Sequence, residues 1–275
     1  MRHRTARFSN SAQHWVWCVA LLMTLGIGCG SKSQGVVEES QDQRAVAQAA
    51  LPEGLSDAEA AAWILEKVDE AAGTDALAKV ESRRTEAVIV MGGQGITIRS
   101  ETFQLGSDQV YSRQEMAGLG TIEMGYDGEV GWSRDPMTGL RQREGTELEE
   151  VKRMTLAYER SFDFAYREKR LLRVDLVDGR PCYELEMIPR VGEPEKHCVD
   201  AETFLPVRLD QTSEGVQGRA QVRSWITSYM EVDGMQVPKE IRAKVGPIEL
   251  VTQVVAVEHG VVVDPEIFAF PGEAN

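Results

Sequence analysis

The sequence predicts a mainly β (α+β) fold: a curved antiparallel sheet of about 10–12 strands with helices on its concave side. Short segments in which polar and apolar residues alternate fill most of the chain after residue 85. Hairpin-type dipeptides, Asp127-Gly128, Asp178-Gly179 and Asp233-Gly234, separate several of these segments. Links of this length join antiparallel neighbours, and so large a sheet has to curl, close or split.

The first 28 residues have the layout of a secretory signal peptide. Residues 1–14 contain Arg2, Arg4 and Arg7 and no acidic residue, and residues 15–28 carry no charge. A basic start, an apolar middle and small residues before a cut site are typical of such signals. A helix over the apolar run would reach only about 21 Å, whereas a hydrocarbon core is about 30 Å thick. An uncleaved anchor is therefore the weaker alternative.

Cys29 follows the small residues that end this apolar run. The stretch from Leu25 to Cys29 resembles the lipobox of bacterial lipoproteins, although Gly26 stands where leucine is usual. The resemblance implies cleavage before Cys29 and attachment of a lipid to its thiol. It also implies export to the cell envelope, and Gly30 after the cysteine favours the outer membrane, facing the periplasm. An ordinary cleaved signal is the alternative.

Residues 29–52 are predicted to form a flexible, lipid-anchored tether. Residues 31–52 are rich in Ser, Gln, Glu and Ala and contain no aromatic residue. Such a segment buries too little apolar surface to offset the entropy lost on ordering. A frayed helix over residues 38–50 is the alternative.

The chain is acidic, with a net charge of −14. Contacts to phosphates need clustered Lys and Arg, so the composition argues against nucleic acid as a partner. After the signal, about 250 residues are left, which is enough for one domain with a substantial core.

A helix is predicted to open the domain. Ser56 and Glu59 form a capping box, and Gly73 is a suitable C-terminal stop. Apolar residues then recur at helical spacing on one face. They are Ala60, Trp63, Ile64, Val68 and Ala71.

The period then changes to two, which predicts strands. The expected strands cover residues 86–91, 95–105, 109–116, 121–126, 129–134, 171–178, 182–188, 196–200, 206–211, 220–230, 239–245 and 248–260. The C-terminal segment 265–271 offers Phe268 and Phe270 as anchors to this sheet.

Between the two groups of strands, a second amphipathic helix is predicted. Thr146 and Glu149 have the spacing of a capping box. Its apolar face contains Leu148, Val151, Thr155, Tyr158, Phe162 and Ala165, and its polar face contains Glu149, Lys152, Arg153, Glu159 and Arg160. Such a helix covers a sheet, either as a fixed layer or as a lid.

Cys182 and Cys198 are predicted to form a disulfide, because an exported chain with two further cysteines favours one. A hairpin centred on Arg190 places Cys182 opposite Cys198 and Glu184 opposite Lys196. A metal site that adds His197 is the alternative, but His197 and Cys198 are neighbours on a strand and point to opposite faces. We therefore expect no metal.

Four segments resemble the periplasmic lipoprotein-carrier superfamily of LolA, LolB and LppX. They are GYDGEVGWSRDPMTGLRQREG (125–145), CVDAETFLPVRLD (198–210), MEVDGMQVPKEIRAKVG (230–246) and VVVDPEIFAFP (261–271). The resemblance implies that residues 53–275 form a single LolA/LolB-like domain, in which helices close an incomplete barrel over an apolar cavity. Members of this superfamily carry acyl chains of lipoproteins or other lipids between membranes.

The resemblance makes particular apolar residues candidates for the cavity, although each is also consistent with an ordinary core. The strand candidates are Val88, Val90, Ile96, Ile98, Met116, Ile122, Met124, Leu172, Val174, Leu176, Leu185 and Met187, and the lid candidates are Leu148, Val151, Tyr158 and Phe162.

No catalytic motif is evident, and we expect no enzyme and no cofactor. After the signal the only histidines are His197 and His259, and the chain contains no GxSxG, HExxH, P-loop or CxxC motif. The predicted function is an anchored envelope lipoprotein that binds acyl chains during lipid or lipoprotein transfer. The alternatives are an envelope lipoprotein that senses a ligand or a protein partner, and a structural envelope component with a filled barrel.

Overall fold

The computed structural model describes residues 50–93, 95–215 and 218–272. The predicted signal, Cys29 and all but the last three residues of the predicted tether lie outside these residues. Within the described part of the chain, thirteen strands form one sheet in the order β6-β5-β4-β3-β2-β1-β13-β12-β11-β10-β9-β8-β7. The strands are β1 (Ser82–Met91), β2 (Ile96–Leu105), β3 (Gln109–Met116), β4 (Gly120–Tyr126), β5 (Gly131–Asp135), β6 (Gly139–Arg143), β7 (Tyr166–Val177), β8 (Arg180–Pro189), β9 (Glu195–Asp200), β10 (Pro206–Gly215), β11 (Gly218–Val232), β12 (Met235–Val245) and β13 (Ile248–His259).

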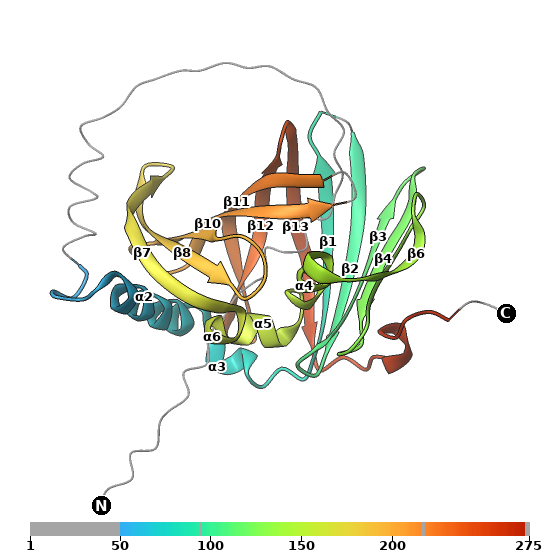
Figure 1. The fold of residues 1–275 in the computed structure, drawn as a ribbon, viewed down its shortest axis with the longest axis horizontal. Coiled ribbons are helices and arrows are strands. Elements are labelled where there is room, and N and C mark those ends of the chain that lie inside the picture. The colour runs from blue at the N-terminus through green and yellow to red at the C-terminus, as the bar shows by residue number, and fades with distance from the viewer. Residues whose placement is uncertain (1–49, 94, 216–217, 273–275) are drawn as a thin grey trace, which may run out of the picture.

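The sheet consists of two antiparallel meanders. Strands β1 to β6 and strands β7 to β13 each follow chain order, and the pairing of β1 with β13 joins the two halves. Several pairs contain bulges, among them β1–β13 at Glu86/Ala87 and β11–β12 near Ser228. Bulges increase twist and bend a strand, which is consistent with the curved sheet in Figure 1. The predicted fold class is confirmed.

The edge strand β6 escaped prediction. Its sequence, GLRQR, contains one large apolar residue, so a hydrophobic alternation is barely present. The predicted hairpin turns are confirmed at two sites, since Asp178 with Gly179 and Asp233 with Gly234 have positive φ at both central positions. This is the backbone of a type I′ turn, whose twist matches that of the flanking strands.

The pairing defines a concave and a convex face. On the concave face Ile89 pairs with Ile98, and Met91 pairs with Ile96. Ile89 and Ile98 are fully buried, whereas Val90, which points to the other face, is 43% exposed. The period-two pattern therefore separates a covered side from a solvent side.

Helix α2 (Asp57–Ala72) covers the concave side of the second half near β7, as Figure 1 shows. Its predicted capping box is present, with Ser56 accepting from the Glu59 amide. Ile64 and Val68 are fully buried in a cluster with Leu185 and Met187 of β8. Gly73 ends the helix at φ 76°, and a Cβ there would lie 2.1 Å from the Gly234 carbonyl oxygen. The short helix α3 (Thr74–Leu77) follows.

The predicted second helix is wrong as one continuous element. The structure has three short helices, α4 (Gly145–Lys152), α5 (Leu156–Arg160) and α6 (Phe162–Ala165). Thr155 and Ser161 are extended and interrupt the helical path. The predicted Thr146 cap is also wrong, because Glu144 precedes α4 and makes no side-chain cap.

The C-terminal segment packs on the convex face of the first half. After the 3-10 turn η2 (Pro265–Ile267), the Phe268 side chain is fully buried, as predicted for an anchor. The Trp132 indole N–H donates to the Phe268 carbonyl at 2.9 Å. A Cβ at Gly125, the cross-strand partner of Trp132, would lie 2.4 Å from the indole nitrogen, so glycine leaves the space for this ring.

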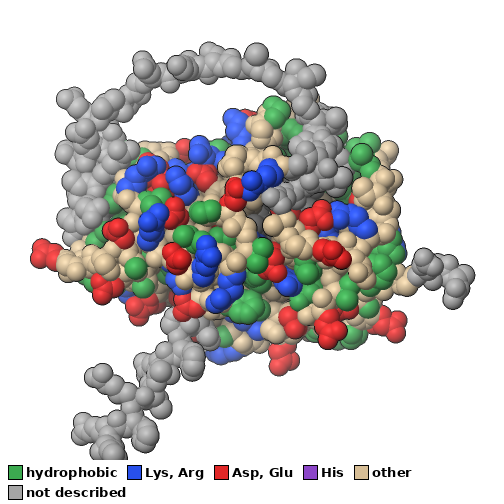
Figure 2. Space-filling model, viewed as in Figure 1, with side chains coloured by type: hydrophobic (Ala, Val, Ile, Leu, Met, Phe, Trp, Pro, Cys, Tyr) green, Lys and Arg blue, Asp and Glu red, His purple; other side chains and the backbone are tan. Residues whose placement is uncertain are grey.

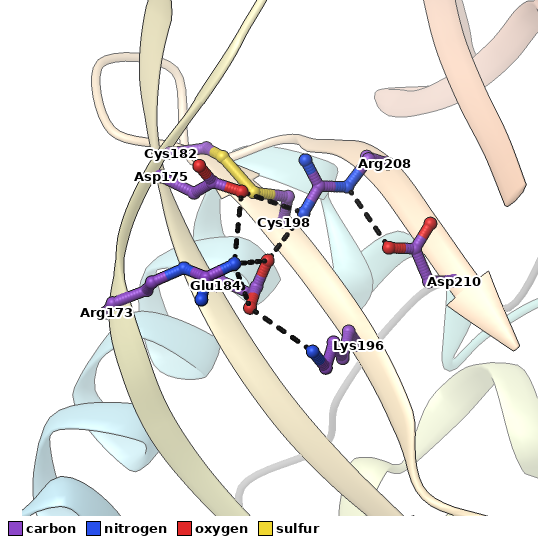
Figure 3. The surroundings of a disulfide bond; sticks show 8 residues. All are labelled: Arg173, Asp175, Cys182, Glu184, Lys196, Cys198, Arg208 and Asp210. Carbon is purple, nitrogen blue, oxygen red and sulfur yellow. Dashed lines mark hydrogen bonds and ion pairs between the residues drawn. A yellow bond between two sulfur atoms is a disulfide. The ribbon is translucent and has the colours of Figure 1, made fainter.

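The predicted disulfide between Cys182 and Cys198 is present on the convex face, with a Cα–Cα distance of 5.5 Å (Figure 3). The predicted register is wrong by two residues, because Cys182 pairs with Asp200, and Glu184 pairs with Cys198. The disulfide therefore joins diagonal neighbours. Lys196 still lies 3.8 Å from Glu184, again as a diagonal contact.

Charged side chains surround this disulfide. The Glu184 carboxylate is 1% exposed, and Arg208 and Arg173 approach it at 2.5 and 3.1 Å. Arg208 also reaches Asp175 at 3.1 Å, as Figure 3 shows. Opposite charges thus compensate the burial of each carboxylate in this patch.

We predict that the double substitution Cys182→Ala with Cys198→Ala lowers the free energy of unfolding by about 3 kcal/mol. The reason is that the disulfide joins residues with a sequence separation of 16 and so restricts the unfolded chain. Urea denaturation of oxidised and reduced protein measures this. Reduction should shift the wild-type midpoint and leave that of the double variant unchanged. Equal midpoints for oxidised and reduced wild type would contradict a stabilising disulfide.

Candidate functional site

The segment that carries α4, α5 and α6, residues 145–165, crosses the concave face and is called the lid segment here. It leaves the edge strand β6 and returns as the other edge strand, β7, so it links the two open edges of the sheet (Figure 1). Val151 is fully buried against Val110, Met124 and Tyr126 of the first half. Phe162, 4% exposed, packs instead in the cluster of α2 and β8.

Close packing fixes the start of the lid segment. A Cβ at Gly131 of β5 would lie 2.4 Å from Leu148 Cδ1, so the absence of a side chain there lets Leu148 approach the strand. Glu147 also accepts two hydrogen bonds from Arg141 of β6. These contacts hold α4 against the edge of the first half.

A buried ion pair ties α5 to the first half of the sheet. Arg83 Nη2 donates to both carboxylate oxygens of Glu159, at 2.5 and 2.6 Å. Gln104 completes the group, because it accepts from Arg83 Nε at 2.6 Å and donates to Glu159 at 2.8 Å and to the Met154 carbonyl. Arg83 and Glu159 are 1% and 3% exposed. Such a pair stabilises only while both charges and their hydrogen bonds are present.

A second buried group ties the end of α4 to β9. Arg153 pairs with Glu195, and Arg153 Nη2 also donates to the Val191 carbonyl at 2.8 Å. The Tyr166 hydroxyl donates to the same carboxylate at 2.7 Å, and His197 Nε2 lies 3.2 Å from it. The Glu195 side chain is 2% exposed. One buried ion pair therefore holds the lid segment to each half of the sheet.

These contacts shift the pKa of Glu195. Burial alone would raise the pKa of its carboxyl, but the hydrogen bond with His197 and the positive charge of Arg153 outweigh burial and lower the pKa below its ordinary value. The carboxylate is thus ionised at neutral pH. Burial next to this carboxylate also raises the pKa of the Tyr166 hydroxyl well above its ordinary value.

A cavity of about 230 Å³ lies between α4 and strands β9 and β10. Charged and polar side chains dominate its wall. The lining residues are Thr146, Glu150, Arg153, Val191, Gly192, Glu193, Glu195, Thr212 and Arg219. The charged ends of these side chains provide hydrogen-bond partners for a polar group.

The concave face itself is divided. One cluster is apolar and contains Ile89, Ile98, Met116, Val222 and Leu250, so it draws on strands of both halves. Buried polar side chains occur on other parts of the same face, among them Ser100 and Gln114, which pair across β2 and β3. The face is therefore not uniformly apolar.

The structure places six of the twelve strand candidates on the concave face as buried residues, divided among three clusters. They are Ile98, Met116, Ile122, Met124, Leu185 and Met187. Ile96, Val174 and Leu176 lie on the same face and are half-buried.

Three candidates lie elsewhere. Val88 and Val90 point to the convex face, where Val88 lines an open groove of about 420 Å³ between charged side chains. Leu172 sits at the bulge between Leu171 and Arg173 and is 37% exposed. Val88 and Val90 were misassigned because all four residues of the run VIVM in β1 are apolar, so alternation does not show which of them face inward. A shift of one residue exchanges the two faces.

Sequence reasoning missed the residues that hold the lid segment. It assigned Arg153 and Glu159 to a solvent-facing side of one helix, whereas they are 8% and 3% exposed. Arg83 and Glu195 received no role. The only sequence signal for burial of Arg83 is that it lies two and four residues before Thr85 and Ala87, which face inward on β1. This signal can be used only once the inward face of β1 is known.

Solved structures share this architecture. A LolA superfamily protein from Nitrosomonas europaea matches with a TM-score of 0.55 at 18% identity, over 76% of this chain and 97% of its own. The chain has a LolA-like fold. A DUF1329 family protein from Desulfovibrio piger matches this LolA-like sheet with a TM-score of 0.53 at 16% identity, over 78% of this chain and 98% of its own.

A domain from Vibrio parahaemolyticus, described by its role in outer membrane lipoprotein sorting, gives a TM-score of 0.53 at 9% identity, over 77% of this chain and 97% of its own. The sequence matches no protein-family profile and no curated protein. The predicted resemblance to the LolA superfamily is thus confirmed at the level of the fold.

Two further observations describe the surroundings of the site. Among residues 50–93, 95–215 and 218–272, no helix is long and apolar enough to cross a membrane. Figure 2 shows the face that carries the lid segment, where positive and negative side chains are interspersed without a continuous block of one sign.

We predict that Glu159→Gln lowers the free energy of unfolding by about 3 kcal/mol or more, because it leaves the Arg83 charge buried without its partner. Glu101→Gln is the matched control, since Glu101 pairs with the neighbouring Arg84 at a partly exposed position. Its cost should stay below about 1 kcal/mol. Urea denaturation checks both values. Equal losses of unfolding free energy in the two variants would contradict a stabilising role of the buried ion pair between Arg83 and Glu159.

We also predict a pH dependence that comes from Glu195. Its lowered pKa stabilises the fold above the ordinary carboxyl value of 4.5, and this stabilisation is lost as the pH falls through the lower pKa of the folded state. Glu195→Gln should therefore be less stable than wild type at pH 7, and the gap should narrow below pH 4.5. Glu202→Gln, at an exposed carboxylate, is the control. A gap that stays constant from pH 7 to acid would contradict the assignment.

Proposed function

We propose that this protein is an envelope lipoprotein that binds acyl chains of lipids or lipoproteins on the concave face of its LolA-like sheet, and that it acts in their transfer or sorting. The observation that carries the proposal is the lid segment, which crosses that face and is held by one buried ion pair to each half. A sheet that only needed a cover could use apolar packing alone, as α2 does. Burying two ion pairs costs desolvation energy that apolar packing would avoid. Such pairs suit a cover that has one defined closed position.

The proposed lining combines the buried concave candidates with the lid. It contains Ile98, Met116, Ile122, Met124, Leu185 and Met187 from the sheet, with Leu148, Val151, Tyr158 and Phe162 above them. Val88, Val90 and Leu172 are left out because of their placement. Methionine side chains adapt to different neighbours, which suits a surface that is filled by different chains.

The proposed location is the cell envelope. The disulfide between two fully buried cysteines fits an oxidising compartment. The anchor at Cys29, the preceding signal and the choice of the outer membrane rest on the sequence pattern. The protein needs no catalytic group for this role, because binding and release of an acyl chain are driven by burial of hydrocarbon.

The test uses the purified full-length chain, made in an oxidising compartment, with native mass spectrometry followed by extraction of bound lipid. Met116→Trp places a large ring on the concave face and should reduce bound lipid several-fold. Val90→Trp is the matched control, because it adds the same ring two strands away on the convex face and should leave binding unchanged.

Unfolding temperatures report whether the variants fold, and Met116→Phe replaces the tryptophan variant if that one does not. Equal loss of lipid in the Met116 and Val90 variants would contradict binding on the concave face. Wild-type protein that carries no lipid and rejects added fatty acids, phospholipids and acylated peptides would overturn the proposal and favour a filled barrel or a protein partner.

A further inference from the structure

In the part of the chain that the structure describes, five uncharged and almost fully buried side chains carry atoms without a hydrogen-bond partner. The atoms are Gln114 Oε1, Ser133 Oγ, Gln211 Oε1 and Nε2, Ser224 Oγ and Thr252 Oγ1. None of the five side chains is more than 2% exposed. Most buried polar atoms in folded proteins are paired, so several unpaired ones require an explanation.

All five side chains lie on the concave face. Ser133 pairs across the strands with Met124, and Thr252 pairs with Ile89. Gln114 lies opposite Ile122. Their strand partners are thus buried residues of the same covered side. Ser224 and Gln211 follow the same pattern, opposite Ala243 and Val222.

The unpaired atoms come from both halves of the sheet, β3 and β5 on one side and β13, β11 and β10 on the other. They are therefore not the result of one local misfit at a bulge or a turn. Each such atom lowers the stability of the folded state, because it gives up its hydrogen bonds to water without a replacement. A chain that keeps several of them on one surface gains stability from anything that supplies partners there.

The chemistry of these atoms restricts what that partner can be. A hydrocarbon chain offers no hydrogen-bonding atom, and an ester offers only acceptors. Gln114 Oε1 and Gln211 Oε1 need a donor, whereas Gln211 Nε2 needs an acceptor, and the hydroxyls serve as either. A secondary amide provides an N–H and a carbonyl side by side, which is the complement of a glutamine side chain.

We propose that Gln211, whose side-chain N–H donor and carbonyl acceptor are both unpaired, selects an acyl chain joined through a secondary amide over one that ends in an ester or a free acid. This inference rests on the proposed function and names the linkage that the same site recognises. The cavity beside α4 supports it, because Ser213, two residues from Gln211 on the same face of β10, donates to Glu150 of the cavity wall at 3.1 Å. Its charged wall would surround the polar end of such a ligand.

The test compares N-palmitoylglycine with its ester analogue, O-palmitoyl glycolic acid, which differs only by oxygen in place of N–H. The full-length chain should bind the amide about tenfold more tightly, which corresponds to about one hydrogen bond. Gln211→Leu should reduce this preference. Gln253→Leu is the control, because Gln253 lies beside Thr252 on β13 and is exposed on the convex face.

Stability without ligand provides a second measurement. Gln211→Leu removes two unpaired atoms at nearly constant size, so the ligand-free variant should melt about 2–4 °C higher than wild type. Higher stability with a weaker amide preference would mark a binding residue. An unchanged melting temperature together with an unchanged preference would show that ordered water serves these atoms, and it would overturn the inference.

The remaining arms separate this inference from the proposed function. A chain that binds palmitate, the ester and the amide equally keeps the proposed function and loses the amide selectivity. A chain that binds none of the three loses both. Where the amide is preferred, an N-acylated peptide and an N-acyl sphingoid lipid, compared at equal chain length, distinguish the two sources of this linkage.

Discussion

The lid segment depends on two buried ion pairs, Arg83–Glu159 and Arg153–Glu195, which fix its position over the sheet. Within the described chain the two halves of the sheet share one strand pairing, β1 with β13, and the opposite edges β6 and β7 do not pair. The lid segment bridges those edges, and one of these ion pairs holds it to each half. The curvature of the sheet and the position of the lid segment thus depend on each other, because a change in the angle between the halves would lengthen one of the two ion pairs.

Buried ion pairs differ from apolar packing in how their contribution to stability is lost when the contact changes. Apolar contacts weaken gradually as surfaces slide, because burial is non-directional. A buried ion pair keeps its energy in one geometry and becomes a liability when one partner is lost. The breaks at Thr155 and Ser161 serve this geometry, since they divide the segment into pieces that turn Arg153 toward β9 and Glu159 toward β1. A single straight helix would keep both on the sides that its period dictates.

The sequence was sufficient for the local features. The capping box at Ser56, the type I′ turns and the disulfide between Cys182 and Cys198 each depend on residues within one element or one hairpin. The failures are of longer range. Arg83 and Glu159 are 76 residues apart, and nothing near either one indicates its partner. The β8–β9 register was two residues off, because diagonal and direct cross-strand neighbours are both compatible with a disulfide and an ion pair.

The same limit explains why alternation alone could not describe the concave face. Period two separates inward from outward residues, but it reads Thr252 and Gln211 as breaks in an apolar pattern. In a packed core these residues would be errors, since replacing them by Val and Leu removes unpaired atoms without loss of volume. In a surface that is completed by a ligand they are the selective part, because apolar residues around them bind any chain equally. Residues that lower the stability of the ligand-free protein are therefore the strongest candidates for recognition on a face that is otherwise apolar or internally hydrogen-bonded.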